Sequence, residues 1–404
     1  MISVEEARRR ILADLIPLPA EQIGLADAFG RVLAEDLAAR RTQPPTAVSA
    51  MDGYAVRAAD VAHTPANLRV IGTAPAGAAF AGVVGPGEAV RIFTGGPLPE
   101  GADTIVIQED VDAAEAEIVV REGAAEGAFV RPAGLDFTAG EVLLKAGHAL
   151  TARDIGLAAS MNVPWLMVRR RPRVAILATG DEIVMPGEPL GPDQIVSSNG
   201  PALAALVKTC GGVPVSLGIV PDDPAALKAA AAAAWGADFL VTSGGASVGE
   251  HDIVQRVLAE AGLAVDFWRV AMRPGKPLIF GRLGDIPMLG VPGNPVSAMV
   301  CGVIFLRPAL ERLLGVDRLQ APPATALLGQ DLGANDQRQD YLRATLSQGE
   351  DGGLVATPFE RQDSSMFLLM ARADCLVVRP PHAPPARAGS PVEIIPLVSG
   401  RVGA

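Results

Sequence analysis

Residues 238–252 read DFLVTSGGASVGEHD and carry the strongest fold signal in the chain. The apolar run at 239–241 predicts a short buried strand, which Gly244 and Gly245 end in a turn, and a helical pattern begins at Asp252. Strand, glycine turn and helix make an ordinary α/β connection. The same geometry also suits an anionic group such as phosphate, because backbone N–H groups of the turn and the helix start face outward.

Length and composition predict a multidomain globular protein. A chain of 404 residues is long enough for two to four domains. Hydrophobic residues make up 49% of it, charged residues 20% and aromatic residues 4%, so the core is built mainly from aliphatic side chains. The formal net charge of -11 argues against a nucleic-acid partner, which would require clustered Lys and Arg.

The start of the chain and its cysteines predict a cytoplasmic protein without a membrane span. The opening MISVEEARRR is a charged helix that lacks the apolar segment of a signal peptide. The Ala-rich run at 225–235 is too short to cross a bilayer and carries Lys228. Cys210, Cys301 and Cys375 form no Cys-x-x-Cys pair, which fits free thiols in a reducing compartment.

Helix signals dominate the first 40 residues. Ser3 and Glu6 form a capping box, so an amphipathic helix is expected to begin there. Residues 26–39 predict a second helix. Pro44 and Pro45 then stop any helix and mark a boundary near residue 42.

The patterns beyond that boundary predict four domains. Residues 43–131 form an all-β insert, because short apolar runs are separated there by Gly and Pro. Its flanks, 1–42 and 132–168, are predicted to pack as one discontinuous α+β domain. Residues 169–317 alternate strand and helix patterns, which predicts a doubly wound parallel sheet with helices on both faces, and residues 318–404 predict a small all-β domain.

Ligands of open α/β sheets bind beyond the carboxyl ends of the strands, and the polar residues of this chain collect there. One rim is therefore expected to bring together glycine turns, carboxylates and two cations. The members are Thr179, Gly180, Asp181, Glu182, Asp222, Asp223, Ser243, Gly244, Gly245, Ser247, Glu250, Asp252, Arg273, Gly275, Lys276, Pro292, Gly293, Asn294 and Pro295. Carboxylates suit Mg²⁺ that also keeps phosphate oxygens, while Lys and Arg neutralise phosphate or a second oxyanion. The rim thus predicts a phosphate site with a divalent metal.

Other readings of the single motifs remain open at this level. An acidic pair after a strand is often a helix N-cap, and an Asp-Gly pair such as Asp52 and Gly53 is a common turn. A Ser-His-Asp hydrolase is disfavoured, because the four histidines are scattered and no G-x-S-x-G elbow occurs.

Six motifs in order give the chain a family resemblance. They are MDGYA at 51–55, RIFTGGPLP at 91–99, ATGDEI at 178–183, TSGGASVGEHD at 242–252, RPGKP at 273–277 and GVPGNPVSA at 290–298. Together they resemble the molybdopterin molybdenumtransferase family, of the MoeA and gephyrin E-domain type. The resemblance implies an elongated four-domain protein with a MogA-like α/β domain and a small C-terminal β-barrel. It also implies a homodimer that inserts molybdate into adenylylated molybdopterin and releases AMP with the assistance of Mg²⁺.

The same resemblance implies a site shared between the α/β domain of one subunit and the β insert of the other. The implied catalytic residues are Asp52, Thr94, Asp136, Arg273 and Lys276, and the implied metal ligands are Glu182, Asp222 and Asp252. The implied substrate-binding residues are Gly180, Ser243, Gly244, Gly245, Ser247, Gly249, Pro292, Gly293, Asn294 and Pro295. Similar proteins usually have Lys where Arg273 stands; activity is expected to persist, with a changed grip on the oxyanion.

Two alternatives come from other reaction or protein classes. A molybdopterin adenylyltransferase acting with ATP shares the α/β domain and the glycine turn, although the extra β domains argue against it. A non-catalytic scaffold would bind a partner through the tail domain. A molybdopterin adenylyltransferase is also a candidate protein partner.

Overall fold

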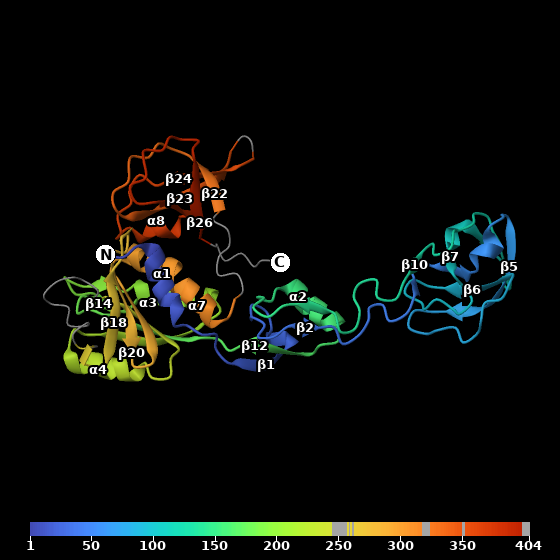
Figure 1. Ribbon diagram of the computed structural model, residues 1–404, viewed down its shortest axis with the longest axis horizontal. Coiled ribbons are helices and arrows are strands. Elements are labelled where there is room, and N and C mark those ends of the chain that lie inside the picture. The colour runs from blue at the N-terminus through green and yellow to red at the C-terminus, as the bar shows by residue number, and fades with distance from the viewer. Residues whose placement is uncertain (245–256, 258, 261, 317–323, 350–351, 398–404) are drawn as a thin grey trace.

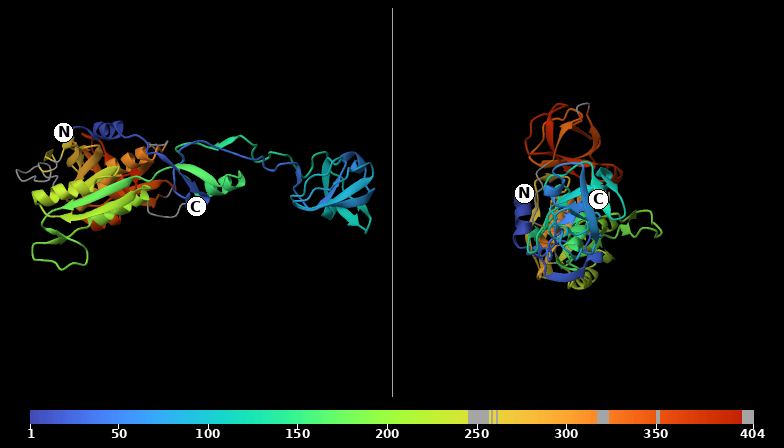
Figure 2. Two further views of the ribbon diagram at one scale, coloured as in Figure 1. Left: turned by 90° about the horizontal axis from the view of Figure 1, so that it is seen from below. Right: turned by 90° about the vertical axis from the view of Figure 1, so that its right-hand side faces the viewer.

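The computed structural model describes residues 1–244, 257, 259–260, 262–316, 324–349 and 352–397. The chain is elongated, with a β domain at one end and the sheet domain with a second β domain at the other (Figures 1 and 2). A slender middle part joins the two ends. No helix in the described part of the chain is long and apolar enough to cross a membrane.

A doubly wound sheet with the strand order β16-β13-β17-β21-β20-β18 forms the largest domain. The first four strands are parallel, as predicted, whereas β20 and β18 run antiparallel to their neighbours. The strands are β13 (Arg173–Thr179), β16 (Val213–Val220), β17 (Phe239–Ser243), β18 (Leu263–Arg269), β20 (Pro277–Leu283) and β21 (Ile286–Val291). β20 and β21 are antiparallel because they are joined by a tight connection at Gly284, which leaves no room for a crossover helix.

Helices cover both faces of this sheet because its strands are apolar on both sides. Alternate residues of β13 enter two separate cores: Val174 and Ile176 pack on one face, Ala175 and Leu177 on the other. The first face is covered by α3 (Asn199–Thr209), α6 (Pro295–Cys301) and α7 (Arg307–Leu313), and the second by α4 (Pro224–Ala233).

Helix α1 (Val4–Ala13) begins at the predicted cap, where Ser3 Oγ accepts a hydrogen bond from the Glu6 N–H at 3.1 Å. Its buried face packs in the core of the sheet domain, next to α7. The domain limits given above remain predictions, but this packing associates the first helix with the sheet rather than with residues 132–168.

The middle domain pairs β1 (Ala20–Gly24) with β12 (Trp165–Arg169) and β2 (Leu37–Ala38) with β11 (Val142–Leu144), and contains α2 (Ala152–Ser160). The predicted helix at 26–39 is wrong: only a short 3-10 turn, η1 (Leu25–Asp27), and β2 lie there. Gly30 has φ +70°, the Leu33 N–H donates to the His148 carbonyl oxygen, and the Arg31 carbonyl oxygen accepts a hydrogen bond from the Leu150 N–H. Tertiary pairing therefore overrides the local helical pattern.

The predicted all-β insert is a six-stranded sheet in the order β7-β4-β6-β5-β9-β8. Its strands are β4 (Gly53–Val56), β5 (Ala66–Ala74), β6 (Glu88–Ile92), β7 (Thr104–Ile107), β8 (Val111–Ala113) and β9 (Glu117–Val120). The chain enters the insert through β3 (Val48–Ser49) and leaves it through β10 (Val130–Arg131), and these two strands pair with each other.

The C-terminal domain is a closed five-stranded barrel. Its strands follow the order β23-β24-β22-β26-β25, and β25 pairs back with β23. They are β22 (Ala324–Leu328), β23 (Gln339–Gln348), β24 (Leu354–Pro358), β25 (Cys375–Arg379) and β26 (Pro391–Pro396), with the short helix α8 (Phe367–Ala371). A short strand of the sheet domain, β19 (Met272–Arg273), adds to β23 and ties the two domains together.

Two glycine substitutions test this packing. A Cβ at Gly53 would lie 2.1 Å from the Val106 carbonyl oxygen, so Gly53→Ala is expected to cost about 1–3 kcal/mol of stability in the insert. Gly156→Ala in α2 meets no atom within 4 Å and is expected to gain up to about 1 kcal/mol. Thermal denaturation, with amide exchange to locate the change, measures both; equal stability of the two variants would contradict the packing of β4 on β7.

Candidate functional site

Three turns meet at the carboxyl ends of β13, β17 and β21. Gly244 has φ +97°, and a Cβ on it would lie 2.3 Å from the Thr179 carbonyl oxygen. A Cβ on Gly293 would lie 3.9 Å from the Gly244 Cα. The approach of the second turn to the first requires a residue without a side chain at position 244, whereas Gly293 of the third turn lies at an ordinary contact distance from Gly244.

Asn199, which the sequence analysis did not select, connects two of these turns. Its Nδ2 donates to Ser243 Oγ at 2.8 Å and to the Gly293 carbonyl oxygen at 2.7 Å, and the residue is 9% exposed. The only local signal is an Asn at the start of α3, which looks like an ordinary helix-start residue. Its partners lie 44 and 94 positions away, so only the fold reveals its role.

Carboxylates gather beside the first turn, at the ends of β13 and β16. Asp181 Oδ1 accepts a hydrogen bond from the Asp222 N–H at 3.1 Å. Asp222 is an exposed residue, yet partial burial of its carboxyl, followed by the charges of Asp181 and Glu182, raises its pKa. Asp223 has a structural role, because its carboxylate accepts a hydrogen bond from the Ala226 N–H at 2.8 Å as the N-cap of α4.

This acidic group suits a divalent cation, since a cation would neutralise carboxylates whose partial burial and mutual repulsion raise the pKa of Asp222. Within the described residues, however, no three His, Cys, Asp or Glu side chains are arranged as a metal-binding group. The third predicted ligand, Asp252, lies outside the described residues, as do the substrate-binding residues Gly245, Ser247 and Gly249.

Lys276 lies at the same edge as the three turns. β20 runs antiparallel to β21, with Ile279 opposite Gly290, so the start of β20 adjoins the end of β21. Lys276 immediately precedes β20, and its side chain is exposed. In the described part of the chain it has no side-chain hydrogen bond or ion pair. The rim therefore presents a cation next to the turn at Gly293.

The neighbouring cation, Arg273, is held by the C-terminal barrel. Its guanidinium forms an ion pair with Asp340, contacts Asp336 Oδ2 at 3.3 Å and donates to Asn335 Oδ1 at 3.4 Å. The barrel also holds the turn after β21, because Asn294 Nδ2 donates to Ser364 Oγ at 3.0 Å. Two turns of the rim, one after β19 and one after β21, thus depend on contacts from the C-terminal barrel.

Pro292, Gly293, Asn294 and Pro295 form the start of α6. Pro292 is buried, Asn294 occupies the N-cap and Pro295 the first helical turn, where a missing N–H is tolerated. The predicted substrate-binding residues of this turn therefore sit together at the rim.

Three predicted catalytic residues lie elsewhere in the chain. Asp52 and Thr94 are neighbours in the insert, where Asp52 Oδ1 accepts from the Thr94 N–H at 2.7 Å and from Thr94 Oγ1 at 2.8 Å. These bonds hold the pKa of Asp52 below its ordinary value. Asp136 is exposed in the link to the insert, where its N–H donates to the Gln43 carbonyl oxygen. The insert is at the far end of the molecule, so the chain does not bring these residues to its own rim (Figures 1 and 2).

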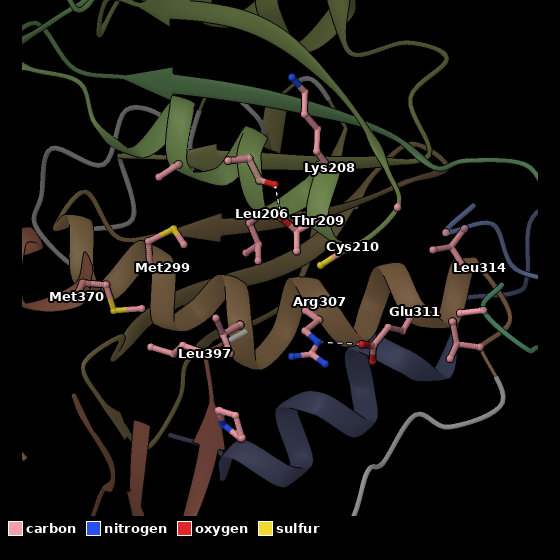
Figure 3. A pocket seen from close by; sticks show the side chains of 18 of the residues that line it. Leu206, Lys208, Thr209, Cys210, Met299, Arg307, Glu311, Leu314, Met370 and Leu397 are labelled. Carbon is pink, nitrogen blue, oxygen red and sulfur yellow. Dashed lines mark hydrogen bonds and ion pairs between the residues drawn. The ribbon is translucent and has the colours of Figure 1, made fainter. Parts of the chain in front are cut away.

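A cavity of about 980 Å³ lies away from the rim, beside the C-terminal half of α3 (Figure 3). Apolar side chains line it, including Leu206 of α3, Met299 of α6 and Leu314 just after α7, and the Arg307–Glu311 pair at 2.9 Å spans one side. None of the predicted site residues lines this cavity.

The fold and the rim define a class, an elongated multidomain α/β protein with a polar ligand edge on a doubly wound sheet. Three family models match in order: the MoeA N-terminal region (domain I and II) at residues 2–162, a probable molybdopterin binding domain at 175–312, and the MoeA C-terminal region (domain IV) at 325–397.

Relatives and solved structures agree over the length of the chain. A molybdopterin molybdenumtransferase of Nostoc sp. is 39% identical over 350 residues, covering 83% of this chain and 80% of the relative. That of Haemophilus influenzae is 34% identical over 401 residues, covering 98% and 99%. The crystal structure of a MoeA protein from Pyrococcus horikoshii superimposes with a TM-score of 0.85 at 31% identity, covering 99% and 100%. The chain belongs to the MoeA family of molybdopterin molybdenumtransferases, as its motifs predicted.

The Asp52–Thr94 pair gives a pH prediction. Because the folded pKa is lowered, the stabilising contribution of the carboxylate is complete above its ordinary value of 3.8 and is lost as the pH falls through the folded pKa. Thr94→Val is expected to raise the midpoint only part of the way to 3.8, since the backbone N–H of residue 94 is the larger cause and remains. Carboxyl NMR titration measures the midpoint. Thr138→Val, which removes a hydroxyl bond to a carboxylate of the middle domain, is the control and should leave the Asp52 midpoint unchanged; an equal shift of the Asp52 midpoint in this variant would contradict the assignment.

A double-mutant cycle tests the contact between Arg273 and the barrel. Arg273→Ala and Asp340→Asn are expected to show a coupling of about 1 kcal/mol in denaturation, because the guanidinium is half exposed and remains screened by water. The Lys145–Asp36 pair, exposed on both sides, is the matched control and should couple more weakly. A zero coupling would show that the contact of Arg273 with Asp340 does not hold this turn.

Proposed function

We propose that this chain inserts molybdate into adenylylated molybdopterin, releases AMP and so forms molybdenum cofactor. The observation that carries the proposal is the meeting of the Thr179, Gly244 and Gly293 turns with an acidic group and Lys276 at one edge of the sheet. This chain aligns with 80% or more of the length of the two relatives above that are named molybdopterin molybdenumtransferase. The adenylyltransferase alternative is not favoured, because the MoeA N-terminal and C-terminal family models also match this chain, on either side of the molybdopterin-binding domain.

Each part of the rim has a role that follows from its chemistry. Backbone N–H groups of the glycine turns bind phosphate oxygens of the adenylylated substrate. Lys276 neutralises the oxyanion of molybdate, and the barrel positions the turn that carries it through Arg273. Because AMP leaves with negative charge, positioning and charge neutralisation are the main catalytic contributions.

The residues that would hold Mg²⁺ are Glu182 and Asp222, together with Asp252. When bound, the ion would neutralise phosphate oxygens and orient the leaving group. Partial burial, followed by the charges of Asp181 and Glu182, raises the pKa of Asp222, and a bound cation would offset both effects.

The position of the insert supports a homodimer with a shared site. Asp52 and Thr94 belong to the insert, which lies at the opposite end of the molecule from the sheet domain. They can therefore contact substrate only at the rim of a second copy. A two-fold dimer would give two equivalent sites, each built from both subunits. A cytoplasmic location is also proposed, consistent with three free thiols, and a molybdopterin adenylyltransferase is the candidate partner that would supply the substrate.

An AMP-release assay tests the function. Purified protein is given adenylylated molybdopterin and molybdate, and Asp52→Ala, Asp252→Ala and Lys276→Ala are each expected to release AMP at least about tenfold more slowly. Lys145→Ala, an exposed lysine of the middle domain, is the control and should leave the rate unchanged. Undiminished release by all three variants would reject the assignment.

A heterodimer tests the shared site separately. One subunit carries Asp52→Ala and the other Lys276→Ala, with different tags for purification. The pair should recover about half of the wild-type rate, because one of its two sites combines an intact rim with an intact insert. A heterodimer as inactive as the single variants would place both residues of a site on one subunit.

A further inference from the structure

Two buried oxygen atoms of the rim have no hydrogen-bond partner in the described structure. They are Thr179 Oγ1, in a residue that is 3% exposed, and Asn199 Oδ1, in a residue that is 9% exposed. Buried polar atoms are paired in the great majority of cases, so two unpaired atoms in one small region require an explanation. The roles given above to the rim leave both atoms unused.

Both atoms lie beside the Gly244 turn. A Cβ on Gly244 would be 2.9 Å from Thr179 Oγ1. The amide of Asn199 is bonded on its nitrogen side to Ser243, the residue before Gly244, and to Gly293, which packs against Gly244. The two oxygens therefore flank the residue at which the three turns of the rim meet.

The orientation of the Asn199 amide is determined by its partners. The Gly293 carbonyl can only accept a hydrogen bond, so the amide nitrogen must face it at 2.7 Å. The Oδ1 atom is then the side of the amide that remains unpaired. Exchanging nitrogen and oxygen would place two acceptors in contact and would not satisfy the group.

We infer that Thr179 and Asn199 form a polar subsite that accepts hydrogen bonds from an N–H edge of the substrate's nitrogen heterocycle, an inference that rests on the proposed function. An amide oxygen only accepts, so it cannot bind phosphate or molybdate oxygens and needs a donor. Adenylylated molybdopterin has such donors in two rings, the adenine and the pterin. Protein atoms cover both oxygens in the free chain, so this subsite requires the backbone at Gly244, which carries no side chain, to shift when the ligand binds.

Thr179→Val is the decisive variant, because it removes the hydroxyl and keeps the shape of the side chain. Removing an unpaired buried hydroxyl should leave the melting temperature unchanged or higher, while affinity falls about two- to tenfold, the value of one hydrogen bond. Calorimetry with AMP alone and with molybdopterin alone shows which ring binds here, because only that ligand should lose affinity. Thr179→Ser, which retains the hydroxyl, should restore it.

Thr104→Val is the matched control. Thr104 is also fully buried, but its hydroxyl donates to the Ala125 carbonyl oxygen at 2.7 Å in the insert. This variant should lose stability and keep its affinity for both ligands, the opposite of Thr179→Val. Asn199→Ala is less informative, since it also releases Ser243 and Gly293 and so changes the turns themselves.

Two outcomes separate this inference from the proposed function. If Thr179→Val loses stability and binds both ligands like the wild type, the hydroxyl is structural and the subsite is rejected, while AMP release by the wild type still supports the function. If the wild type binds neither AMP nor molybdopterin and releases no AMP from the adenylylated substrate, the proposed function itself fails.

Discussion

The close approach of Gly244 to Thr179 is the constraint on which the ligand edge depends. Two strands that are adjacent in a parallel sheet end at the same edge, but their turns pack this tightly only when one of them lacks a side chain. The contact leaves space for Asn199 to reach both Ser243 and Gly293. A methyl group at position 244 would separate the turns and break the bridge between them.

The C-terminal barrel contributes to that edge although it contains none of the predicted site residues. It binds the turn before β20 through Arg273 and the turn after β21 through Ser364. The planar guanidinium of Arg273 contacts three acceptors of the barrel at once. Arg273 thus belongs to the connection between the domains, and Lys276 is an exposed cation beside the rim.

The elongated shape separates the two groups of residues that the proposed site would combine. The insert is connected to the sheet domain only through the paired strands β3 and β10 and the slender middle domain, so its Asp52 cannot fold back onto the rim of the same chain. Asp52 is nevertheless held ionised by the bonds from Thr94. A charged side chain held in the insert, apart from the rim of its own chain, fits the proposed second copy.

The order of strands and glycine turns, the all-β insert and the family motifs could be read from the sequence alone, because they depend on local periodicity and on residues close together in the chain. Contacts between segments far apart in the chain could not be predicted in this way. The segment 26–39 pairs with residues near 150 instead of forming a helix, and Asn199 gains its role from a carbonyl 94 positions away. Arg273 likewise meets Asp340 only across a domain boundary. Tertiary structure decided these features, since the partner that determines each of them lies beyond the range of any local pattern.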